Sequence, residues 1–302
     1  MDDFLIKLDS EIEKINIKIE KTIDSLKDRD METIYEGAIY ATVPGGKRLR
    51  PLLLVKTYDM FAKDEDFLND IVYPFAVAIE LIHSYSLVHD DLPSMDNDSL
   101  RRGKASTHIV FGEGMAVLIG DYLLNASYEI ISKALLDTSE KYPEKIDNVL
   151  QAFDIIASLS GSKGMVGGQS IDIEVTLEDY KNLGNEEGER LLSKMISLKT
   201  GGLIKASIIA GGLLGGANKE EMEILKDFSE NLGMAFQITD DFLDFEEDNR
   251  ARKPTYPTVL GEKIGREMAE KTKSNALKAL KLLGQDTSFI EAFSKMLINR
   301  EK

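Results

Sequence analysis

Apolar residues recur at three- and four-residue steps along most of the chain, which is the pattern of one buried face of a helix. The first such stripe consists of Leu5, Leu8, Ile12, Ile15, Ile19, Ile23 and Leu26. Asp28-Arg29-Asp30 interrupts the stripe, and a second helix is predicted over 31–42, ending at Val43-Pro44-Gly45-Gly46.

The same periodicity predicts a series of longer helices in the rest of the sequence. They cover 52–62, 68–91, 113–137, 144–160, 188–213, 219–246, 260–283 and 286–300. The segments between them are short and either polar or rich in glycine, and no segment alternates apolar and polar residues between turn pairs, so we expect no sheet. The sequence therefore predicts an all-α protein, with one large domain of ten or more helices over residues 1–302.

Composition narrows the classes of partner and of chemistry. The 302 residues include 37 Lys and Arg against 53 Asp and Glu, which gives a net charge of −16 and argues against binding to nucleic acid or to an anionic membrane. The chain has no cysteine, which excludes disulfides, thiolate catalysis and cysteine metal sites and favours a reducing compartment.

Neither a signal peptide nor a membrane span is predicted. The acidic, amphipathic start lacks the basic and apolar regions of a signal peptide. The longest nearly apolar stretch, Leu203 to Ala217, is interrupted by Lys205 and is too short to cross a bilayer. We expect a soluble cytoplasmic protein.

A first cluster of carboxylates follows the apolar segment that ends at His89. It consists of Asp90, Asp91, Asp96 and Asp98. Carboxylates this close repel one another unless a cation binds between them, and hard divalent ions prefer such oxygen ligands. An acidic helix end is the alternative interpretation. An EF-hand loop does not fit, because Leu100 stands where the third ligand belongs.

A second cluster, Asp240, Asp241 and Asp244, lies among apolar residues of the helix predicted over 219–246. On a helix Asp240 and Asp244 share a face, about 6 Å apart along the axis. Carboxylates in apolar surroundings are costly unless a metal compensates them. Two such clusters suggest two walls of one cavity that hold several Mg²⁺ ions between them.

Basic residues beside glycines suggest binding of phosphate oxygens, although any one of them alone is more often part of a solvated face. They are Lys47, Arg48 and Arg50 after Gly45-Gly46, Arg101-Arg102 before Gly103, Lys199 before Thr200-Gly201-Gly202, and Lys253. No P-loop or dinucleotide fingerprint occurs, and the three histidines lack the spacing of a zinc site. We interpret His89 as structural.

Six segments together resemble the trans-isoprenyl diphosphate synthases, in particular the farnesyl and geranylgeranyl diphosphate synthases. They are GGKRLRP at 45–51, IHSYSLVHDDLPSMDNDSLRRGK at 82–104, GMVGGQSIDI at 164–173, KTGGLIKAS at 199–207, FQITDDFLD at 236–244 and KPTYPTVLG at 253–261. The resemblance covers nearly the whole chain. It implies helices around a central cavity and a homodimer.

The resemblance also implies roles for individual residues. The ligands of three Mg²⁺ ions, for which Mn²⁺ is a possible substitute, would be Asp90, Asp91, Asp96, Asp240, Asp241 and Asp244. Isopentenyl diphosphate would be bound by Lys47, Arg50, His83 and Arg102. The allylic diphosphate would be contacted by Arg101, Lys199, Gln237 and Lys253. Oxygens of Thr200 and Gln237 would stabilise the allylic cation, and Gln169 and Asp172 would line the cavity.

The implied reaction is ionisation of an allylic diphosphate, which releases diphosphate, followed by attack of the double bond of isopentenyl diphosphate on the cation and loss of a proton to the released diphosphate. The catalytic set would be Asp90, Asp91, Asp96, Lys199, Thr200, Gln237 and Asp240. An aromatic residue at the position of Tyr85, with small Ser86 beside it, implies a block that stops growth at fifteen carbons. From composition alone, Tyr85 is equally well an ordinary core aromatic.

Three departures from the family pattern and several alternatives stay open at this point. Only FEEDNRARKPTYP follows Asp244, where members commonly have a longer loop with Gly-Lys and a further Asp, and either Arg250 or Arg252 is a candidate replacement for the missing Lys. Ser99 and the stretch 105–107 also differ, with small consequences. The alternatives are a geranylgeranyl diphosphate synthase, a terpene cyclase, which needs no second diphosphate site, and a non-catalytic subunit, which would be expected to lose aspartates.

Overall fold

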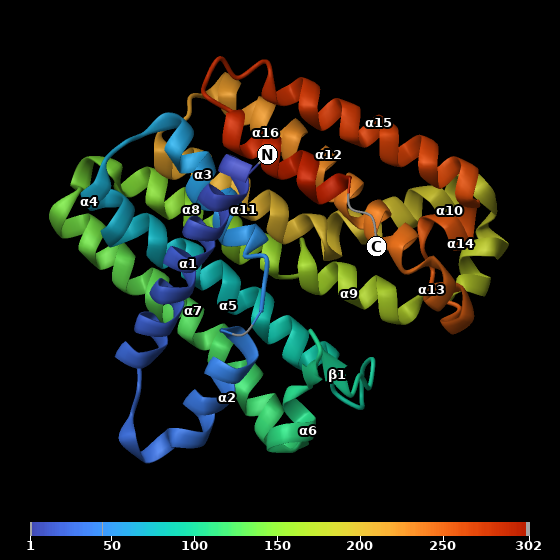
Figure 1. Ribbon diagram of the computed structural model, residues 1–302, viewed down its shortest axis with the longest axis horizontal. Coiled ribbons are helices and arrows are strands. Elements are labelled where there is room, and N and C mark those ends of the chain that lie inside the picture. Colours follow the sequence, from blue (N-terminus) through green and yellow to red (C-terminus); the bar gives the residue numbers. More distant parts are fainter. Residues whose placement is uncertain (1, 44, 300–302) are drawn as a thin grey trace. The chain divides into compact units, whose positions relative to one another are not determined.

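The computed structural model describes residues 2–43 and 45–299, and it is built almost entirely of helices (Figure 1). More than ten helices lie in these residues, so the predicted all-α class is confirmed. The chain divides into two compact units, residues 1–55 with 63–150 (unit 1) and residues 56–62 with 151–302 (unit 2). The single domain and the central cavity expected from the sequence stay predictions.

Unit 1 begins with α1 and ends within α8. Its elements are α1 (Asp2–Ser25), η1 (Arg29–Met31), α2 (Glu32–Thr42), the first part of α3 (Leu49–Phe61), α4 (Glu65–Phe67), the π-helical turn η2 (Leu68–Val72), α5 (Tyr73–Asp90), β1 (Leu100–Arg101), β2 (Lys104–Ala105), α6 (Thr107–Phe111), α7 (Glu113–Lys141), η3 (Pro143–Lys145) and the start of α8 (Ile146–Ser160).

Unit 2 contains the remaining helices, together with the end of α3 and the rest of α8. They are α9 (Met165–Glu174), α10 (Leu177–Lys199), α11 (Gly201–Gly215), α12 (Lys219–Leu243), α13 (Phe245–Ala251), α14 (Tyr256–Leu260), α15 (Glu262–Leu280) and α16 (Ser288–Ile298).

The long helices lie close to their predicted ranges, and the differences have local causes. The helix expected over 188–213 is interrupted at Thr200, between α10 and α11, and α10 begins earlier than predicted, at Leu177, with a kink at Gly184. The short helices α4, α6, α9, α13 and α14 were not predicted, because they span too few turns to show a clear period. Pro44 and residue 300, at the predicted ends of two helices, lie outside the described residues.

The prediction that the chain has no sheet is wrong in one place. β1 and β2 form a two-stranded antiparallel ribbon in which Leu100 pairs with Ala105. The two residues between the strands, Arg102 and Gly103, both have positive φ, 52° and 76°, as a tight hairpin turn requires. Strands of two residues are too short to show alternation in the sequence.

The core of unit 1 is the packing of α5 along α7 (Figure 1). Most residues of α5 are buried, which explains why its sequence shows no polar face. The helical stretch Glu65–Asp90 is long and apolar enough to cross a membrane, so the longest apolar stretch was misjudged from the sequence. However, 78% of the most apolar 18 residues of this stretch is buried inside the protein, which is typical of a core helix.

In unit 2, α12 packs against both α11 and α15. A Cβ added to Gly233 would lie 2.9 Å from Gly201 Cα, so the absence of a side chain lets α12 approach the start of α11 closely. A buried cluster joins α10, α12 and α14 next to the second aspartate motif. It consists of Tyr180, Leu192, Met195, Ile196, Ile238, Tyr256 and Leu260.

Candidate active site

The predicted site residues fall into two sets, one in each unit. In unit 1, α5 ends at Asp90 and the following turn reverses the chain. The Asp96 N–H donates to the Asp90 carbonyl at 2.9 Å, so the turn brings the last aspartate of the motif back to the helix end. Asp90 is half-buried, Asp91 is buried and Asp96 is exposed.

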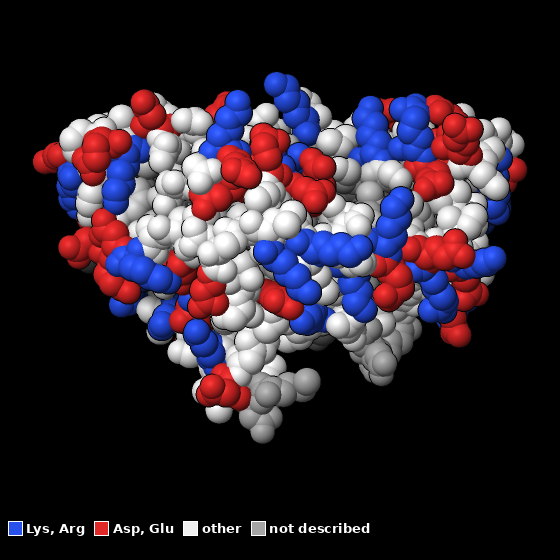
Figure 2. Space-filling model, turned by 90° about the horizontal axis from the view of Figure 1, so that it is seen from above, with Lys and Arg blue, Asp and Glu red and all other residues white. Residues whose placement is uncertain are grey.

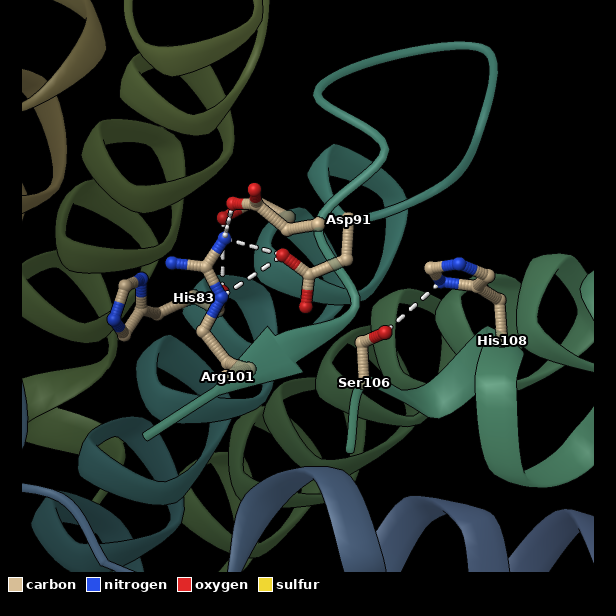
Figure 3. A network of polar contacts seen from close by, with 7 residues as sticks. His83, Asp91, Arg101, Ser106 and His108 are labelled. Carbon is tan, nitrogen blue, oxygen red and sulfur yellow. Dashed lines mark hydrogen bonds and ion pairs between the residues drawn. The ribbon is translucent and has the colours of Figure 1, made fainter. Parts of the chain in front are cut away.

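Asp91 is held by a cation of the same unit (Figure 3). Arg101, on β1, donates from Nε to Asp91 Oδ1 at 2.8 Å, and its Nη2 also donates to Asp91 and to Asp98. Burial raises the pKa of Asp91, while the hydrogen bond and charge of Arg101 oppose the rise. The structure therefore assigns Arg101 a partner within the first motif.

The cations that the resemblance links to isopentenyl diphosphate lie together in unit 1. A Cβ added to Gly46 would lie 3.1 Å from Arg102 Nη1, so the end of the Arg102 side chain reaches the GGKRLRP segment. The pKa of His83 is well below its usual value because the half-buried ring is desolvated and because Arg50 and Arg102 are near. His83 is therefore neutral at pH 7 and can donate one N–H to an anion. Lys47 is exposed on the same segment.

Tyr85 faces α7. Its side chain is buried, and its ring meets the His89 ring edge-on at 5.8 Å. His89 Nε2 lies 3.1 Å from the Val117 carbonyl of α7, which fits its predicted structural role. Burial, with Tyr128 and Asp90 nearby, raises the pKa of Tyr85 to about 12. Ser86, on the next face of α5, donates its hydroxyl to the His83 carbonyl at 2.8 Å.

The second motif, in unit 2, lies at the end of α12. The Asp244 N–H donates to the Asp240 carbonyl at 3.0 Å, and Asp244 is the residue that caps the end of the helix. Asp240 is half-buried, Asp241 is buried and Asp244 is exposed. The Asp240–Asp244 spacing therefore places both on the helical turn that the sequence predicts.

Asp241 accepts hydrogen bonds from uncharged donors. Gln237 Nε2 donates to Asp241 Oδ1 at 2.8 Å, and the Tyr256 N–H donates to Oδ2 at 3.1 Å. Burial raises the pKa of Asp241 to about 7, although both hydrogen bonds act to lower it. Thr200 Oγ1 in turn donates to Gln237 Oε1 at 2.5 Å. The chain of contacts fixes the Gln237 amide, with its oxygen toward Thr200.

Lys199 and Thr200 lie at the break between α10 and α11. Lys199 Nζ donates to Asp172 Oδ2 of α9, so the structure brings together two residues from different predicted motifs. A Cβ on Gly168 would lie 2.2 Å from Lys199 N, so this close approach of α9 requires glycine. Gln169 follows Gly168 on the same helix, half-buried.

The loop after the second motif contains a short helix, α13. Lys253 is exposed, and its N–H donates to the Asp248 carbonyl at 2.9 Å. Of the two candidate replacements for the missing lysine, Arg250 pairs with Glu246 at 3.8 Å and Arg252 with Glu178 at 3.6 Å. Both arginine side chains therefore form ion pairs with exposed carboxylates, Arg250 within α13 and Arg252 with α10.

The carboxylates of the two aspartate motifs suit Mg²⁺ that is held jointly by protein and substrate better than a metal ion held by protein ligands alone. Among residues 2–43 and 45–299, no group of three or more His, Cys, Asp or Glu side chains is arranged to hold a metal ion. Mg²⁺ is usually held through one or two carboxylates together with substrate phosphates and water. The pairs Asp90–Asp96 and Asp240–Asp244, each joined through the backbone, fit that requirement.

Comparison with known proteins identifies the family. A family model described as Polyprenyl synthetase matches residues 31–288, which is most of the chain. The chain belongs to the polyprenyl synthetase family. The sequence-based resemblance is therefore confirmed.

Curated relatives and solved structures agree with this membership. The chain is 41% identical to the farnesyl diphosphate synthase of Geobacillus stearothermophilus over 232 residues, 73% of each chain. It is 38% identical to a chloroplastic geranylfarnesyl diphosphate synthase of Leucosceptrum canum, covering 91% of this chain and 74% of that one. A geranyltransferase structure from Legionella pneumophila matches with a TM-score of 0.85 at 30% identity, covering 99% of this chain and 98% of that chain.

Polyprenyl synthetase motifs did not identify every residue that shapes the two sets. Tyr256 supplies a backbone N–H to Asp241, and its hydroxyl lies 2.6 Å from Ser193 Oγ. Arg48 and Glu80 form a buried ion pair beside the cations of unit 1. Arg48 had a signal in the sequence as one of three cations beside Gly45-Gly46, and Tyr256 lies in the KPTYPTVLG segment, although neither contact was predicted; a lone Glu in an apolar helix gives no signal.

Proposed function

We propose that this polyprenyl synthetase is a chain-elongating trans-prenyltransferase that condenses isopentenyl diphosphate with an allylic diphosphate, dimethylallyl or geranyl. The observation that carries the proposal is the cation set of unit 1, in which Arg50 and Arg102 lie near His83 and the end of the Arg102 side chain reaches the GGKRLRP segment. Such a set supplies a second diphosphate site, which elongation needs and cyclisation does not.

Magnesium is the proposed cofactor, and Mn²⁺ a substitute. The residues proposed to hold it are Asp90, Asp91, Asp96, Asp240, Asp241 and Asp244. When bound, Mg²⁺ neutralises the charge that develops on the leaving diphosphate. The half-buried and exposed members of each motif offer the more accessible oxygens, because both oxygens of Asp241 already accept hydrogen bonds.

The side chains of the protein bind, orient and stabilise charge. Lys47, Arg50 and Arg102, with the neutral His83, bind the diphosphate of isopentenyl diphosphate through charge-assisted hydrogen bonds. Arg101, Lys199 and Lys253 bind the allylic diphosphate. Oxygens of Thr200 and Gln237 face the positive charge that forms on the allylic carbon. Proximity of the two substrates then makes attack by the isopentenyl double bond effectively unimolecular. The cation that this attack leaves loses a proton to the released diphosphate, which restores a double bond.

The proposed product is farnesyl diphosphate, with geranylgeranyl diphosphate as the alternative. Two relatives with the name farnesyl diphosphate synthase support the shorter product, from Geobacillus stearothermophilus and, at 34% identity over 99% of this chain and the whole of that one, from Escherichia coli. Buried Tyr85 on α5 is the residue proposed to limit growth. A non-catalytic subunit is less well supported, since neither motif has lost an aspartate.

We also propose that the chain forms a homodimer through α7. Three apolar side chains of this helix, Val117, Leu118 and Leu136, are 40%, 50% and 68% exposed.

Nucleic acid is not a proposed partner: acidic and basic residues are interspersed on the face shown in Figure 2, where a nucleic-acid surface would present a continuous basic field. The cytoplasmic location stays a prediction.

The function is tested by incubating the protein with isopentenyl diphosphate, Mg²⁺ and each allylic primer in turn. Mass spectrometry of the products should show the fifteen-carbon diphosphate as the main species and none after addition of a chelator. A twenty-carbon main product would support the alternative, and no product from any primer would reject the proposed activity.

A further inference from the structure

A buried ion pair in unit 1 has no role in the reaction as described above. Arg48 lies between Lys47 and Arg50, and Glu80 lies on α5, one turn before His83. Their side chains are 0% and 2% exposed, and Arg48 Nη1 donates to Glu80 Oε1 at 2.8 Å. Desolvation of two charges offsets most of their attraction, so net stability alone does not explain such a pair.

Arg48 connects three separate parts of unit 1. Its Nε donates to Asn16 Oδ1 of α1 at 2.7 Å, and its Nη2 donates to the Val43 carbonyl, just after α2, at 2.7 Å. With the bond to Glu80 of α5, every nitrogen of the guanidinium has an acceptor. Because the group is planar and rigid, three such bonds fix both its position and its orientation.

The backbone shows that the segment is held in an unusual conformation. Arg48 has a φ of 47°, in the left-handed region that side chains other than glycine rarely adopt, and such residues persist where their surroundings determine them. At this turn Lys47 is exposed while Arg48 is buried. Anchoring Arg48 therefore sets the direction in which Lys47 leaves the segment.

Arg48 also lies close to Arg102, the cation on the turn of the β1–β2 hairpin. A Cβ on Gly46 would lie 3.3 Å from Arg48 Nη1 and 3.1 Å from Arg102 Nη1, so both guanidinium groups abut the same glycine. Like charges this close repel one another, and the buried carboxylate of Glu80 offsets that repulsion.

We propose that Arg48 and Glu80 are positioning residues, which hold Lys47, Arg50 and Arg102 at the spacing that binds a diphosphate. The inference rests on the proposed function, in which these cations bind isopentenyl diphosphate. It predicts that the pair controls affinity for isopentenyl diphosphate and leaves the allylic substrate unaffected.

The test replaces both partners by apolar residues of similar size, Arg48→Met with Glu80→Leu. Exchange of a whole buried ion pair for apolar side chains is often neutral for stability, so we expect a melting temperature within about 3 °C of the wild type. Calorimetric titration with isopentenyl diphosphate in EDTA should show a dissociation constant about tenfold higher, as for one lost charge-assisted hydrogen bond. In turnover assays, KM for isopentenyl diphosphate should rise about as much, with kcat and the allylic KM changed less than about twofold.

Two further variants keep the test decisive. Arg48→Lys keeps the charge but loses the fork, and should weaken binding by a smaller factor even if the double variant fails to fold. Lys145→Met breaks another ion pair of unit 1, with Asp64 at 2.9 Å, and should leave isopentenyl diphosphate binding unchanged.

The outcomes separate this inference from the proposed function. Unchanged binding in folded Arg48→Lys and double-variant proteins would overturn the positioning role, as would a wild type that does not bind isopentenyl diphosphate. If the wild type binds it and the variants bind it weakly, yet no primer is elongated, the positioning role stands and the proposed function fails.

Discussion

The two aspartate motifs reach the same local arrangement from different spacings. In unit 2, Asp240 and Asp244 are four residues apart, and the N–H of the last donates to the carbonyl of the first as in any helix. In unit 1, Asp90 and Asp96 are six residues apart, and the turn after α5 makes the same bond. In both motifs the first aspartate is half-buried, the second is buried and the last is exposed.

The motifs differ in what holds the buried second aspartate. Asp91 is paired with the guanidinium of Arg101, whereas Asp241 accepts from an amide and a backbone N–H. No cation among the described residues pairs with Asp241, and burial raises its pKa to about 7. The Asp-Asp sequence of the two motifs therefore has two electrostatic environments. In the first motif Arg101 compensates the buried carboxylate of Asp91, and in the second no cation among the described residues compensates that of Asp241.

The largest effect should come from removing the first aspartate of either motif. Asp90→Ala and Asp240→Ala should each remove leaving-group stabilisation and lower kcat by roughly 10²- to 10⁵-fold, because each tenfold step is 1.36 kcal/mol. Steady-state kinetics at saturating Mg²⁺ measures this, with circular dichroism to show that both variants fold. Near-normal turnover in either would mean that the shared backbone arrangement has no common role.

The helices that lead into the motifs also differ, five residues before each first aspartate. That position is Tyr85 on α5 and Ala235 on α12, both buried. Tyr85→Ala should cost about 3–5 kcal/mol of stability if the ring is fully packed, and less if it lines a cavity. It should also lengthen the product to twenty carbons or more, as read by mass spectrometry. Tyr85→Phe is the control, and a folded, active Tyr85→Ala enzyme with wild-type products would refute the chain-length role.

Mutations of the cations near the two motifs should affect different substrates. Arg50→Ala should mainly raise KM for isopentenyl diphosphate, and Lys199→Ala should mainly slow the reaction of the allylic partner, each by about 10- to 150-fold for 1.5–3 kcal/mol. Kinetics with each substrate varied in turn distinguishes the two. The assignment of Arg50 would be wrong if its loss left the isopentenyl diphosphate kinetics unaltered.

The smallest predicted effect concerns pH and the neutral His83 of unit 1. The pKa of His83 is lowered in the folded protein, so below about pH 6.5 the unfolded chain binds a proton that the folded chain does not. Stability should therefore fall as pH falls, by up to about 1.4 kcal/mol per pH unit from this group. His83→Gln should lose less stability than the wild type between pH 7.5 and pH 5.5 in thermal melts. Parallel losses in both proteins would contradict the assignment.

Sequence periodicity was sufficient for the long helices because each buries a repeated apolar face or is apolar throughout. It was insufficient where structure depends on few residues, as in the Arg102-Gly103 hairpin and in α14. The motifs identified Asp90, Asp240 and the cations by residue type. They did not reveal the partners of Asp91 and Asp241, because Arg101 and Gln237 were assigned to substrate rather than to these carboxylates, and Tyr256 bonds through its backbone. The sequence identified Arg48 as a cation beside Gly45-Gly46. It did not predict that Arg48 is buried, because its partners Asn16 and Glu80 are far from it along the chain.

The central claim is that the protein uses two diphosphates to make one carbon–carbon bond. Its most direct test measures diphosphate release from geranyl diphosphate with Mg²⁺, with and without isopentenyl diphosphate, and compares it with the new bonds formed. The account predicts rapid release only when isopentenyl diphosphate is present, with one diphosphate released per bond. Equally rapid release without isopentenyl diphosphate would indicate a cyclase-type ionisation, and no release in either case would indicate a non-catalytic chain; both results would contradict the claim.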